Sequence, residues 1–553
     1  MSINRDRRSA GLILLLAFAL GVCVFAVTQI SYGIVEDRAL APSESLGFVS
    51  LAMDIYSYYS FIHQAAGGSF FFRNNMTHET CSAAFINLQW WLAGRCMAWF
   101  DWSPQFLFIV WRFAGSIALM LGFAVLALVT LEKPHQQVVA LLMCAFGGGF
   151  GWAITIFGAM GLLDLSDTFG LRNPAMDLIT AIHPFGQIMK NPHYSLPHGT
   201  LLLFLACYVM GERSGCARWY AVAAGVAVLQ GLFRPYDTIT IMAMIPFFIG
   251  VESLTSRKLD VRRATLRLLP AIASAPLLFY YYYLFSIHPI FTYWAEQGKQ
   301  PPASMFWHTL SLGLVGLLCI YRVARRKRLP LAGSWERMLA VFAATVLILY
   351  HGNHLTRLLS FSPQIGIPLV SVLILLSMPV LSALAARWSR FGKRGLAAAL
   401  VGFLILNALS SPLYVQWSGS IGAITPRNYI TPSEREAILW LAERAEPDDV
   451  ILSGEPMGAR IAFLTPLRVA MGHWALTPNV KLLKRKFERF AIGDLPPERA
   501  VEFIKEVQPR YILLTDIEDA GKPAYYRKNA GAERVFANDD TIIYEVVGPP
   551  QTR

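Results

Sequence analysis

Long apolar runs separated by short polar segments make up about the first 415 residues of the chain. An α-helix needs about 20 apolar residues to cross a bilayer, and most of the runs approach or exceed that length. We therefore predict a polytopic α-helical membrane protein with about eleven membrane-spanning helices. The predicted spans are about 11–34, 106–131, 137–163, 198–211, 219–233, 236–251, 268–287, 305–323, 338–350, 364–385 and 396–415.

Basic residues cluster in alternate connections between these spans. The clusters are MSINRDRR at the N-terminus, ERSGCAR, SRKLDVRRATLR, RVARRKR and RWSRFGKRG. Lys and Arg concentrate in cytoplasmic loops of membrane proteins, so we place the N-terminus and these loops in the cytoplasm. The first run is longer than the apolar core of a signal peptide and lacks a clear cleavage site, which predicts an uncleaved first span.

Two long polar stretches near the N-terminus are then predicted to be large outer loops. The first, 35–105, contains no clean span but is rich in tryptophan, as is typical of helices at a membrane interface. The second, 164–197, is rich in Asp and His. We assign 1–415 to a transmembrane domain that carries both loops.

The pattern changes after about residue 416. Helical periodicity in REAILWLAERA and RAVEFIKEV alternates with the short apolar strands DDVILSG, RYILLT and TIIYEVV. This alternation predicts a small extracytoplasmic α/β domain of parallel character over 416–553. No GxGxxG follows a strand, so we predict no nucleotide site there.

Composition supports the membrane assignment. Of the 553 residues, 55% are hydrophobic and 15% charged, and the mean hydropathy of +0.45 excludes an ordinary soluble enzyme. The net charge of +12 lies in short loops, so we predict no nucleic-acid partner. The seven cysteines show no CxxC spacing, and Cys81 and Cys96 form either one disulfide or two thiols.

Asp54 is the first candidate for chemistry. It follows the first span in an aromatic, amphipathic stretch with Tyr56, Tyr58, Tyr59 and His63. A carboxylate in a partly dehydrated cleft can act as a general base on an acceptor hydroxyl or bind a metal beside a phosphate. The alternative is an interfacial carboxylate that caps a helix or forms an ion pair.

The second loop supplies further ionisable side chains that could bind a divalent ion. They are Asp164, Asp167, Asp177, His183, His193 and His198. Their spacing matches no standard metal motif, so most of them are expected to be solvated. His193 remains a candidate because it lies where the loop re-enters the membrane.

Two arginines are candidates for binding a phosphate. Arg234 and Asp237, in FRPYD, form either a mutual ion pair or a functional pair, because ionisable groups inside a membrane are costly. Arg357, with His351 and His354, can grip a phosphate through two N–H groups or snorkel to the interface. The loop MGHWALTPN, with His473 and Trp474, either stacks on a sugar or forms a packed turn.

Several short sequence segments along the chain carry a family resemblance. They are DIYSYYSFIHQAAGG, FFFRNNMT, NPHYSLPHGTLLL, FRPYD, HLTRLLSFSPQIGIPL, EREAILWLAERAEPDDVIL and MGHWALTPN. With the first span, the acid early in a long first loop and the C-terminal domain, they resemble the GT-C superfamily of membrane glycosyltransferases over nearly the full length. That superfamily includes protein mannosyltransferases and oligosaccharyltransferase catalytic subunits, and the likeness is greatest to bacterial members.

The resemblance implies an inverting glycosyltransferase of the bacterial cell envelope. The sugar would pass from a polyprenyl-phosphate-linked donor to an extracytoplasmic acceptor, which is a glycan, lipid or protein, at the outer face of the inner membrane. Asp54 matches the position of the family's first-loop acid. Our own candidates for substrate binding are Tyr58, His63, His193, Arg234, Asp237, His354 and Arg357.

The resemblance leaves metal dependence open. The second loop lacks an Asp-x-Asp or Glu-x-Asp pair, so Mg or Mn bound by Asp54 or His193 remains an alternative. Two other functions also stay open: a transporter or lipid-handling protein, and a non-catalytic scaffold for envelope assembly.

Overall fold

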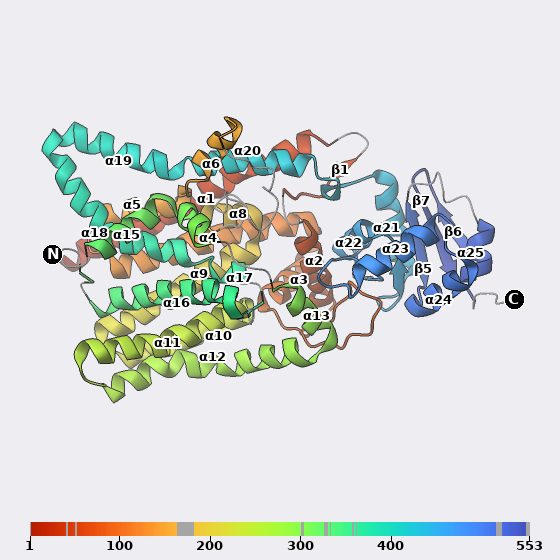
Figure 1. Cartoon of the computed structure of the whole chain (residues 1–553), viewed down its shortest axis with the longest axis horizontal. Helices are drawn as coiled ribbons and strands as arrows, with labels where there is room; N and C mark the ends of the chain where they lie inside the picture. Colours follow the sequence, from red (N-terminus) through yellow and green to blue (C-terminus); the bar gives the residue numbers. More distant parts are fainter. Residues whose placement is uncertain are drawn as a thin grey trace. The chain divides into compact units, whose positions relative to one another are not determined.

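The protein is described here by a computed structural model (Figure 1). The structure describes residues 2–39, 43–49, 52–162, 182–299, 304–325, 330–331, 333–356, 359–360, 362–515 and 523–548. The chain divides into two compact units. The helical unit contains Met1–Ser31, Ile109–Tyr282 and Gly298–Ser418, and the mixed unit contains Tyr32–Phe108, Tyr283–Gln297 and Gly419–Arg553.

Helices of very different lengths, most of them apolar, build the helical unit. They are α1 (Ser2–Asp37), α4 (Pro104–Thr130), α5 (Pro134–Phe146), α6 (Gly151–Ala159), α8 (Pro184–Lys190), α9 (Pro192–Ser214), α10 (Ala217–Phe233), α11 (Pro235–Ser256), α12 (Val261–Ile287), α14 (Met305–Ser311), α15 (Gly313–Ala324), α16 (Ser334–Thr356), α17 (Ser362–Ile365), α18 (Leu369–Trp388), α19 (Gly392–Ala408) and α20 (Ser410–Ala423). A short 3₁₀ turn, η1 (Ser389–Phe391), joins α18 to α19.

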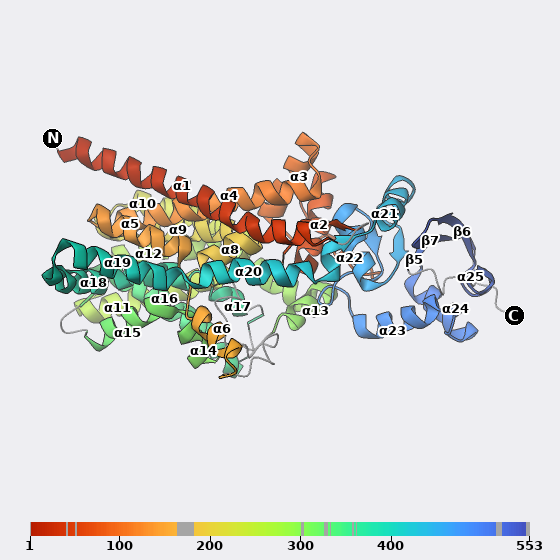
Figure 2. The same cartoon turned by 90° about the horizontal axis from the view of Figure 1, so that it is seen from above.

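Eight stretches of the described chain are long and apolar enough to cross a membrane, judged by length and composition. A ninth is formed if α14 and α15, which meet at a bend of 109°, make one broken span. Every predicted span overlaps one or two helices, and α19 and α20 follow each other as one such stretch (Figures 1 and 2). The prediction of a multi-pass α-helical membrane protein is confirmed.

The sequence places the helix starts and the closest helix contacts. Proline, which fits the first turn of a helix, begins α4, α5, α8, α9 and α11. A Cβ on Gly122 of α4 would overlap the backbone of Gly199 on α9, and a Cβ on Gly199 would overlap the backbone of Ala118 and Leu119 on α4. Small residues allow this approach between apolar helices in a membrane protein.

The segment predicted as the second outer loop differs from the prediction where the structure describes it. Residues 184–190 form α8, and α9 begins at Pro192 rather than at about residue 198. All seven residues of α8 are buried. Arg112 on α4, itself fully buried, donates from Nε to the backbone oxygen of Ile188 at 3.3 Å and so holds α8 in place.

The mixed unit combines the first predicted loop with the C-terminal domain. Its elements are β1 (Glu44–Ser45), α2 (Ala52–Ala66), α3 (Leu88–Phe100), α13 (Pro289–Gln297), η2 (Pro426–Asn428), β2 (Tyr429–Ile430), α21 (Pro432–Arg444), β3 (Val450–Leu452), α22 (Glu455–Leu464), β4 (Arg468–Val469), α23 (Val480–Ala491), α24 (Pro497–Val507), β5 (Tyr511–Thr515), α25 (Pro523–Ala530), β6 (Ala532–Ala537) and β7 (Thr541–Val546). The division at 416 stays a prediction, since this compact unit also includes 32–108 and 283–297.

The main sheet has the strand order β4-β3-β5-β7-β6. Strand β3 pairs in parallel with β4 and β5, as predicted, but β7 is antiparallel to β5 and to β6. The parallel prediction is therefore wrong for the last two strands, because β6 and β7 form a hairpin instead of being joined by a helix.

Helices cover both faces of this sheet. Successive side chains of a strand point to opposite faces. Ile512 and Leu514 of β5 pack in the core with residues of α23, α24 and α25, which lie together beside the sheet in Figure 2. Tyr511, on the other face, contacts Trp440 of α21 edge to face.

The first predicted loop covers the free edge of β4. The backbone N–H of Val469 donates to the oxygen of Asn75 at 2.9 Å, and Thr77 forms an antiparallel bridge with Met471. The Arg468 guanidinium donates to the oxygens of Thr77 and Glu79 at 3.0 and 2.6 Å. Both segments therefore fold as parts of the same unit.

Candidate functional site

The candidate residues fall into two groups, one in each unit.

The first group centres on Asp54 in the first turn of α2. Its Oδ1 lies 3.2 Å from Nε2 of His473, which belongs to the predicted loop MGHWALTPN. The His473 side chain is 3% exposed, whereas that of Asp54 is 32% exposed. The Asp54 carboxylate is therefore bound to His473 within the unit and remains partly accessible from outside it.

The protonation state of His473 follows from its second nitrogen. The backbone N–H of Ala475 donates to Nδ1 at 3.1 Å, so Nδ1 accepts and carries no proton. The proton of the neutral ring is then on Nε2, which donates to Asp54. His473 is thus a neutral donor rather than an imidazolium partner of the carboxylate.

The loop that carries His473 is a packed turn. The Thr477 hydroxyl accepts from the backbone N–H groups of Gly472 and His473 at 3.2 and 3.3 Å and donates to the oxygen of Met76. A Cβ on Gly472 would overlap the sulfur of Met76, which explains the glycine. Trp474 stacks on His473 with a centroid distance of 5.7 Å, and 41% of it is exposed.

The three tyrosines of α2 make contacts with other parts of the unit. The Tyr56 hydroxyl donates to the oxygen of Arg427, and that of Tyr59 to the oxygen of Pro104 at 2.6 Å. The ring of Tyr58 stacks on Trp90 with a centroid distance of 4.7 Å.

His63 also lies away from Asp54. Nine residues of α-helix correspond to about two and a half turns, so the two side chains point to opposite sides of α2. The Nε2 of His63 lies 2.8 Å from the oxygen of Phe463 on α22. Burial lowers the pKa of His63 from 6.5 to about 4, an effect that the Phe463 oxygen partly offsets. A substrate-binding role for His63 or Tyr58 stays a prediction.

The second group centres on Arg234 at the junction of α10 and α11. Arg234 and Asp237 are both fully buried, and Nη2 of Arg234 lies 2.7 Å from Oδ1 of Asp237. The same nitrogen donates to the backbone oxygen of Gln364 at 3.1 Å, and Gln230 donates to the other oxygen of Asp237. Nε and Nη1 of Arg234 have no hydrogen-bond partner in the described part of the chain.

Two histidines of α9 lie near Arg234. His193 and His198 lie within electrostatic range of Arg234. Nδ1 of His198 is 2.7 Å from Oε1 of Gln187 on α8. The expectation that most of the second-loop side chains are solvated is wrong for His183 and His198, which are buried because α8 and α9 enter the helical unit. His193, which was kept as a candidate, is buried as well.

Sequence reasoning missed Lys190 at the end of α8. Its side chain is buried, and Nζ lies 5.4 Å from the centre of the Tyr414 ring. Over the residues that the structure describes, it makes no hydrogen bond or ion pair. The available signal was the apolar PFGQIM before Lys190, which starts with a proline and so predicts a short helix.

Other predicted residues cannot be placed in either group. Arg357, Asp164, Asp167 and Asp177 lie outside the described residues, as does the side chain of His354. His351 faces His308, with 2.8 Å between Nε2 and Nδ1. Cys81 and Cys96 are free thiols.

Metal binding stays a prediction. The described residues hold no cluster of three or more His, Cys, Asp or Glu side chains placed to bind an ion. Because Nε2 of His473 carries a proton, it cannot serve as a ligand beside Asp54 in this state. A cation at Asp54 needs the other carboxylate oxygen and ligands from the substrate or from residues outside the described ranges.

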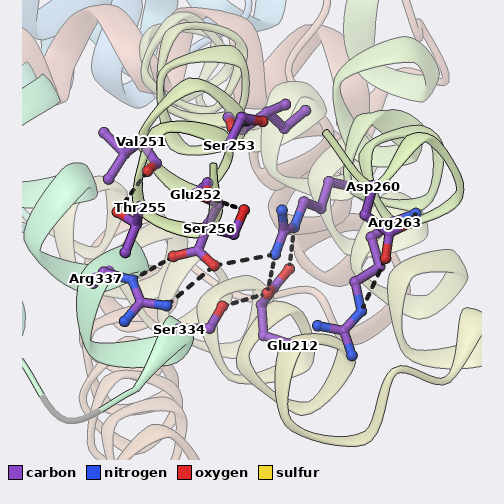
Figure 3. A network of polar contacts seen from close by, with 12 residues as sticks. Glu212, Val251, Glu252, Ser253, Thr255, Ser256, Asp260, Arg263, Ser334 and Arg337 are labelled. Atoms are coloured by element: carbon purple, nitrogen blue, oxygen red, sulfur yellow. Dashed lines mark hydrogen bonds and ion pairs between the residues drawn. The ribbon is translucent and has the colours of Figure 1, made fainter. Parts of the chain in front are cut away.

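A third polar cluster lies at the opposite ends of the same helices. Arg267 on α12 bonds both oxygens of Glu212 on α9 at 2.7 Å and lies 3.7 Å from Glu252 on α11. Glu212, Glu252, Ser334 and Arg337 are labelled in Figure 3. Arg337 on α16 bonds Glu252, and Ser334 donates to Glu212 at 2.6 Å. Each carboxylate has a cationic partner within the cluster. The cluster therefore joins four helices and needs no ligand to balance its charges.

Solved structures of two kinds of protein resemble the whole chain. The Archaeoglobus fulgidus oligosaccharyltransferase tethered to an acceptor peptide matches with a TM-score of 0.55 and 11% identity, over 98% of this chain and 74% of that one. The same organism's AglB, with an inhibitory peptide and a dolichol-phosphate, gives 0.54 and 11% over 93% and 71%. ArnT from Cupriavidus metallidurans in the apo state gives 0.50 and 13% over 96% and 97%.

No family model and no curated protein matches the sequence. AglB and ArnT are both GT-C glycosyltransferases, and identities this low show a common fold. The chain has the GT-C fold, which confirms the resemblance predicted from its sequence.

Proposed function

We propose that this protein is a membrane glycosyltransferase that moves a sugar from a polyprenyl-phosphate-linked donor to an extracytoplasmic glycan, lipid or protein. One observation carries the proposal: Arg234 is fully buried, yet two of its guanidinium nitrogens have no partner among the described residues. Burying unsatisfied donors of a charged group is costly, so this site favours an anionic ligand. A phosphate oxygen pair matches the fork of N–H groups that a guanidinium presents.

Asp54 has the features of a general base for the acceptor. Its carboxylate receives one hydrogen bond from His473 and is partly exposed, so lone pairs remain for an acceptor hydroxyl. In the proposed step the acceptor O–H proton moves to Asp54 while the acceptor oxygen bonds to the anomeric carbon. The bond from that carbon to the phosphate oxygen breaks, and the phosphate leaves with the electron pair.

Arg234 is assigned to the leaving phosphate. Negative charge develops on the phosphate oxygens as the bond breaks, and fixed N–H donors in a dehydrated site stabilise that charge. Attack from the face opposite the leaving phosphate gives inversion. Arg357, His193, Asp237 and His354 are proposed to complete the binding of the donor, and Tyr58 and His63 to support the acceptor side.

The solved neighbours support a lipid-phosphate donor. The AglB structure contains a dolichol-phosphate, which is a polyprenyl-type carrier. The structure of the Archaeoglobus fulgidus oligosaccharyltransferase tethered to a peptide contains an acceptor. By analogy we place the protein in the cell inner membrane, with a cytoplasmic N-terminus and a periplasmic C-terminal domain.

The test uses the full-length protein in nanodiscs with a panel of polyprenyl-phosphate sugars. We expect the wild type to bind one donor and release polyprenyl phosphate. We expect Asp54→Asn to keep donor binding and lose turnover by at least about 100-fold, a typical contribution of a general base. Arg234→Gln should weaken donor binding, and Arg357→Ala tests the second predicted phosphate ligand.

Matched controls are Asp494→Asn and Arg444→Gln, both on exposed side chains of the mixed unit. They should behave as the wild type. If no donor binds or turns over, and folded Asp54→Asn and Arg234→Gln resemble the wild type, the transporter or scaffold function replaces this proposal.

A further inference from the structure

We propose that His473 is the positioning residue for Asp54. In this view a neutral imidazole fixes one oxygen of the carboxylate so that the other oxygen meets the acceptor hydroxyl. The inference rests on the proposed function of Asp54, but it concerns a residue 419 positions away in the sequence.

The hydrogen bonds of His473 define its role. Nε2 donates to Oδ1 of Asp54 at 3.2 Å, and Nδ1 accepts the backbone N–H of Ala475 at 3.1 Å. A protonated ring would bring a second N–H against that of Ala475, so this geometry favours the neutral form. His473 can therefore orient Asp54 but has no free nitrogen with which to take a proton.

The loop around His473 is rigid enough to position a partner. Thr477 ties the backbone N–H groups of Gly472 and His473 to the oxygen of Met76, and Met471 bridges Thr77. The ring is 3% exposed, so it has little freedom to change rotamer. Asp54 and its partner thus belong to one packed unit, as precise placement of a catalytic group requires.

One carboxylate oxygen is left for chemistry. Oδ1 is held by His473, while the Asp54 side chain as a whole is 32% exposed. In the transfer step, the acceptor proton moves to Oδ2 and the imidazole keeps its own proton throughout. The charge of His473 therefore does not change during the reaction.

The experiment compares His473→Ala and His473→Gln with the wild type in the nanodisc transfer assay. His473→Ala removes the hydrogen bond to Asp54 and should lower kcat by about 100-fold, the effect of misplacing a catalytic group by about 1 Å. The KM for the polyprenyl-phosphate sugar should not change. The glutamine amide can donate from a similar distance, so His473→Gln should recover most of the activity. The pH–rate profile of His473→Gln should keep the wild-type shape, because in the proposed step the imidazole only donates its hydrogen bond to Asp54.

The control is His135→Ala, which replaces an exposed histidine of the helical unit and should leave kcat unchanged. Thermal melting of each variant shows whether it is folded, and His473→Gln carries the test if His473→Ala is not. Full activity of folded His473→Ala, or equal losses in both variants, would overturn the inference. Loss of one limb of the pH–rate profile in His473→Gln would also overturn it, by making the imidazole itself the base.

These experiments distinguish failure of the positioning role of His473 from failure of the proposed transferase function. If the wild type turns over and Asp54→Asn does not, while His473→Ala is unaffected, only the positioning role fails. If the wild type turns over no donor, the proposed function fails and the role of His473 with it.

Discussion

Arg234 and Asp237 lie one helical turn apart, and their ion pair occupies a single guanidinium nitrogen of Arg234, Nη2. The ion pair between Arg234 and Asp237 is present, yet two further guanidinium nitrogens of Arg234, Nε and Nη1, have no hydrogen-bond partner among the described residues. Structure and ligand binding can thus share one residue.

Removing Asp237 should expose this division of roles. Asp237→Asn leaves a buried cation unpaired and should lower the free energy of unfolding by about 3–5 kcal/mol. Added polyprenyl phosphate should restore part of that loss, since a ligand that binds the folded state stabilises it. Arg234→Gln with Asp237→Asn should remove the ligand effect. Equal melting shifts with ligand in both variants would contradict an anion at Arg234.

The charge of Lys190 should lower the stability of the protein and strengthen the binding of an anionic ligand. Lys190→Met keeps the length of a buried side chain and removes a charge without a partner in the described chain, so the melting temperature should stay equal or rise. If the ammonium helps to hold an anion, binding of polyprenyl phosphate should weaken in the same variant. Lys393→Met, on an exposed lysine of α19, is the control. A large drop in melting temperature would indicate a structural partner instead.

The cluster in Figure 3 predicts where the helical unit is sensitive to charge removal. Glu212→Ala leaves Arg267 buried, with the more distant Glu252 as its remaining acidic partner among the described residues, and should cost about 3–5 kcal/mol of unfolding free energy. Glu443→Ala, on an exposed side chain, should cost almost nothing. Denaturation of both variants in detergent measures the difference, and similar losses would rule out a special role for the cluster.

His63 gives the mixed unit a dependence on pH. Because burial lowers its pKa from 6.5 to about 4, the unfolded chain binds a proton that the folded chain refuses between these values. The contribution of neutral His63 to stability is therefore complete above about pH 6.5 and declines as the pH falls toward 4. His63→Gln, which can still bond the Phe463 oxygen, should melt with a weaker pH dependence in that window. An unchanged slope would show that His63 is protonated in the folded state.

The helices and the outline of the site could be predicted because their signals are local. Apolar runs of membrane length fix the spans, and Asp54 is conspicuous as an acid early in an aromatic segment. Arg234 and Asp237 are three residues apart, so their pairing could be considered from the sequence alone.

The rest depends on contacts between distant segments. The partner of Asp54 is 419 residues away, and only the folded unit brings His473 to it. Strand β4 has two residues, and β6 has mostly exposed side chains, so neither shows the alternation that identifies a strand. Segment 182–197 looks polar in the sequence, yet its histidines and Lys190 are buried in the helical unit rather than exposed to water.

The pairing of Asn75 with Val469 has a consequence for how the chain is made. The residues that border β4 are synthesised before most of the membrane-length helices, and β4 is synthesised after all of those that the structure describes. Until β4 is made, the early segment has no strand to border, and a fragment that begins after these helices would present a bare sheet edge, which invites aggregation. The order of synthesis thus lets this edge of the sheet be covered only after these helices have been made.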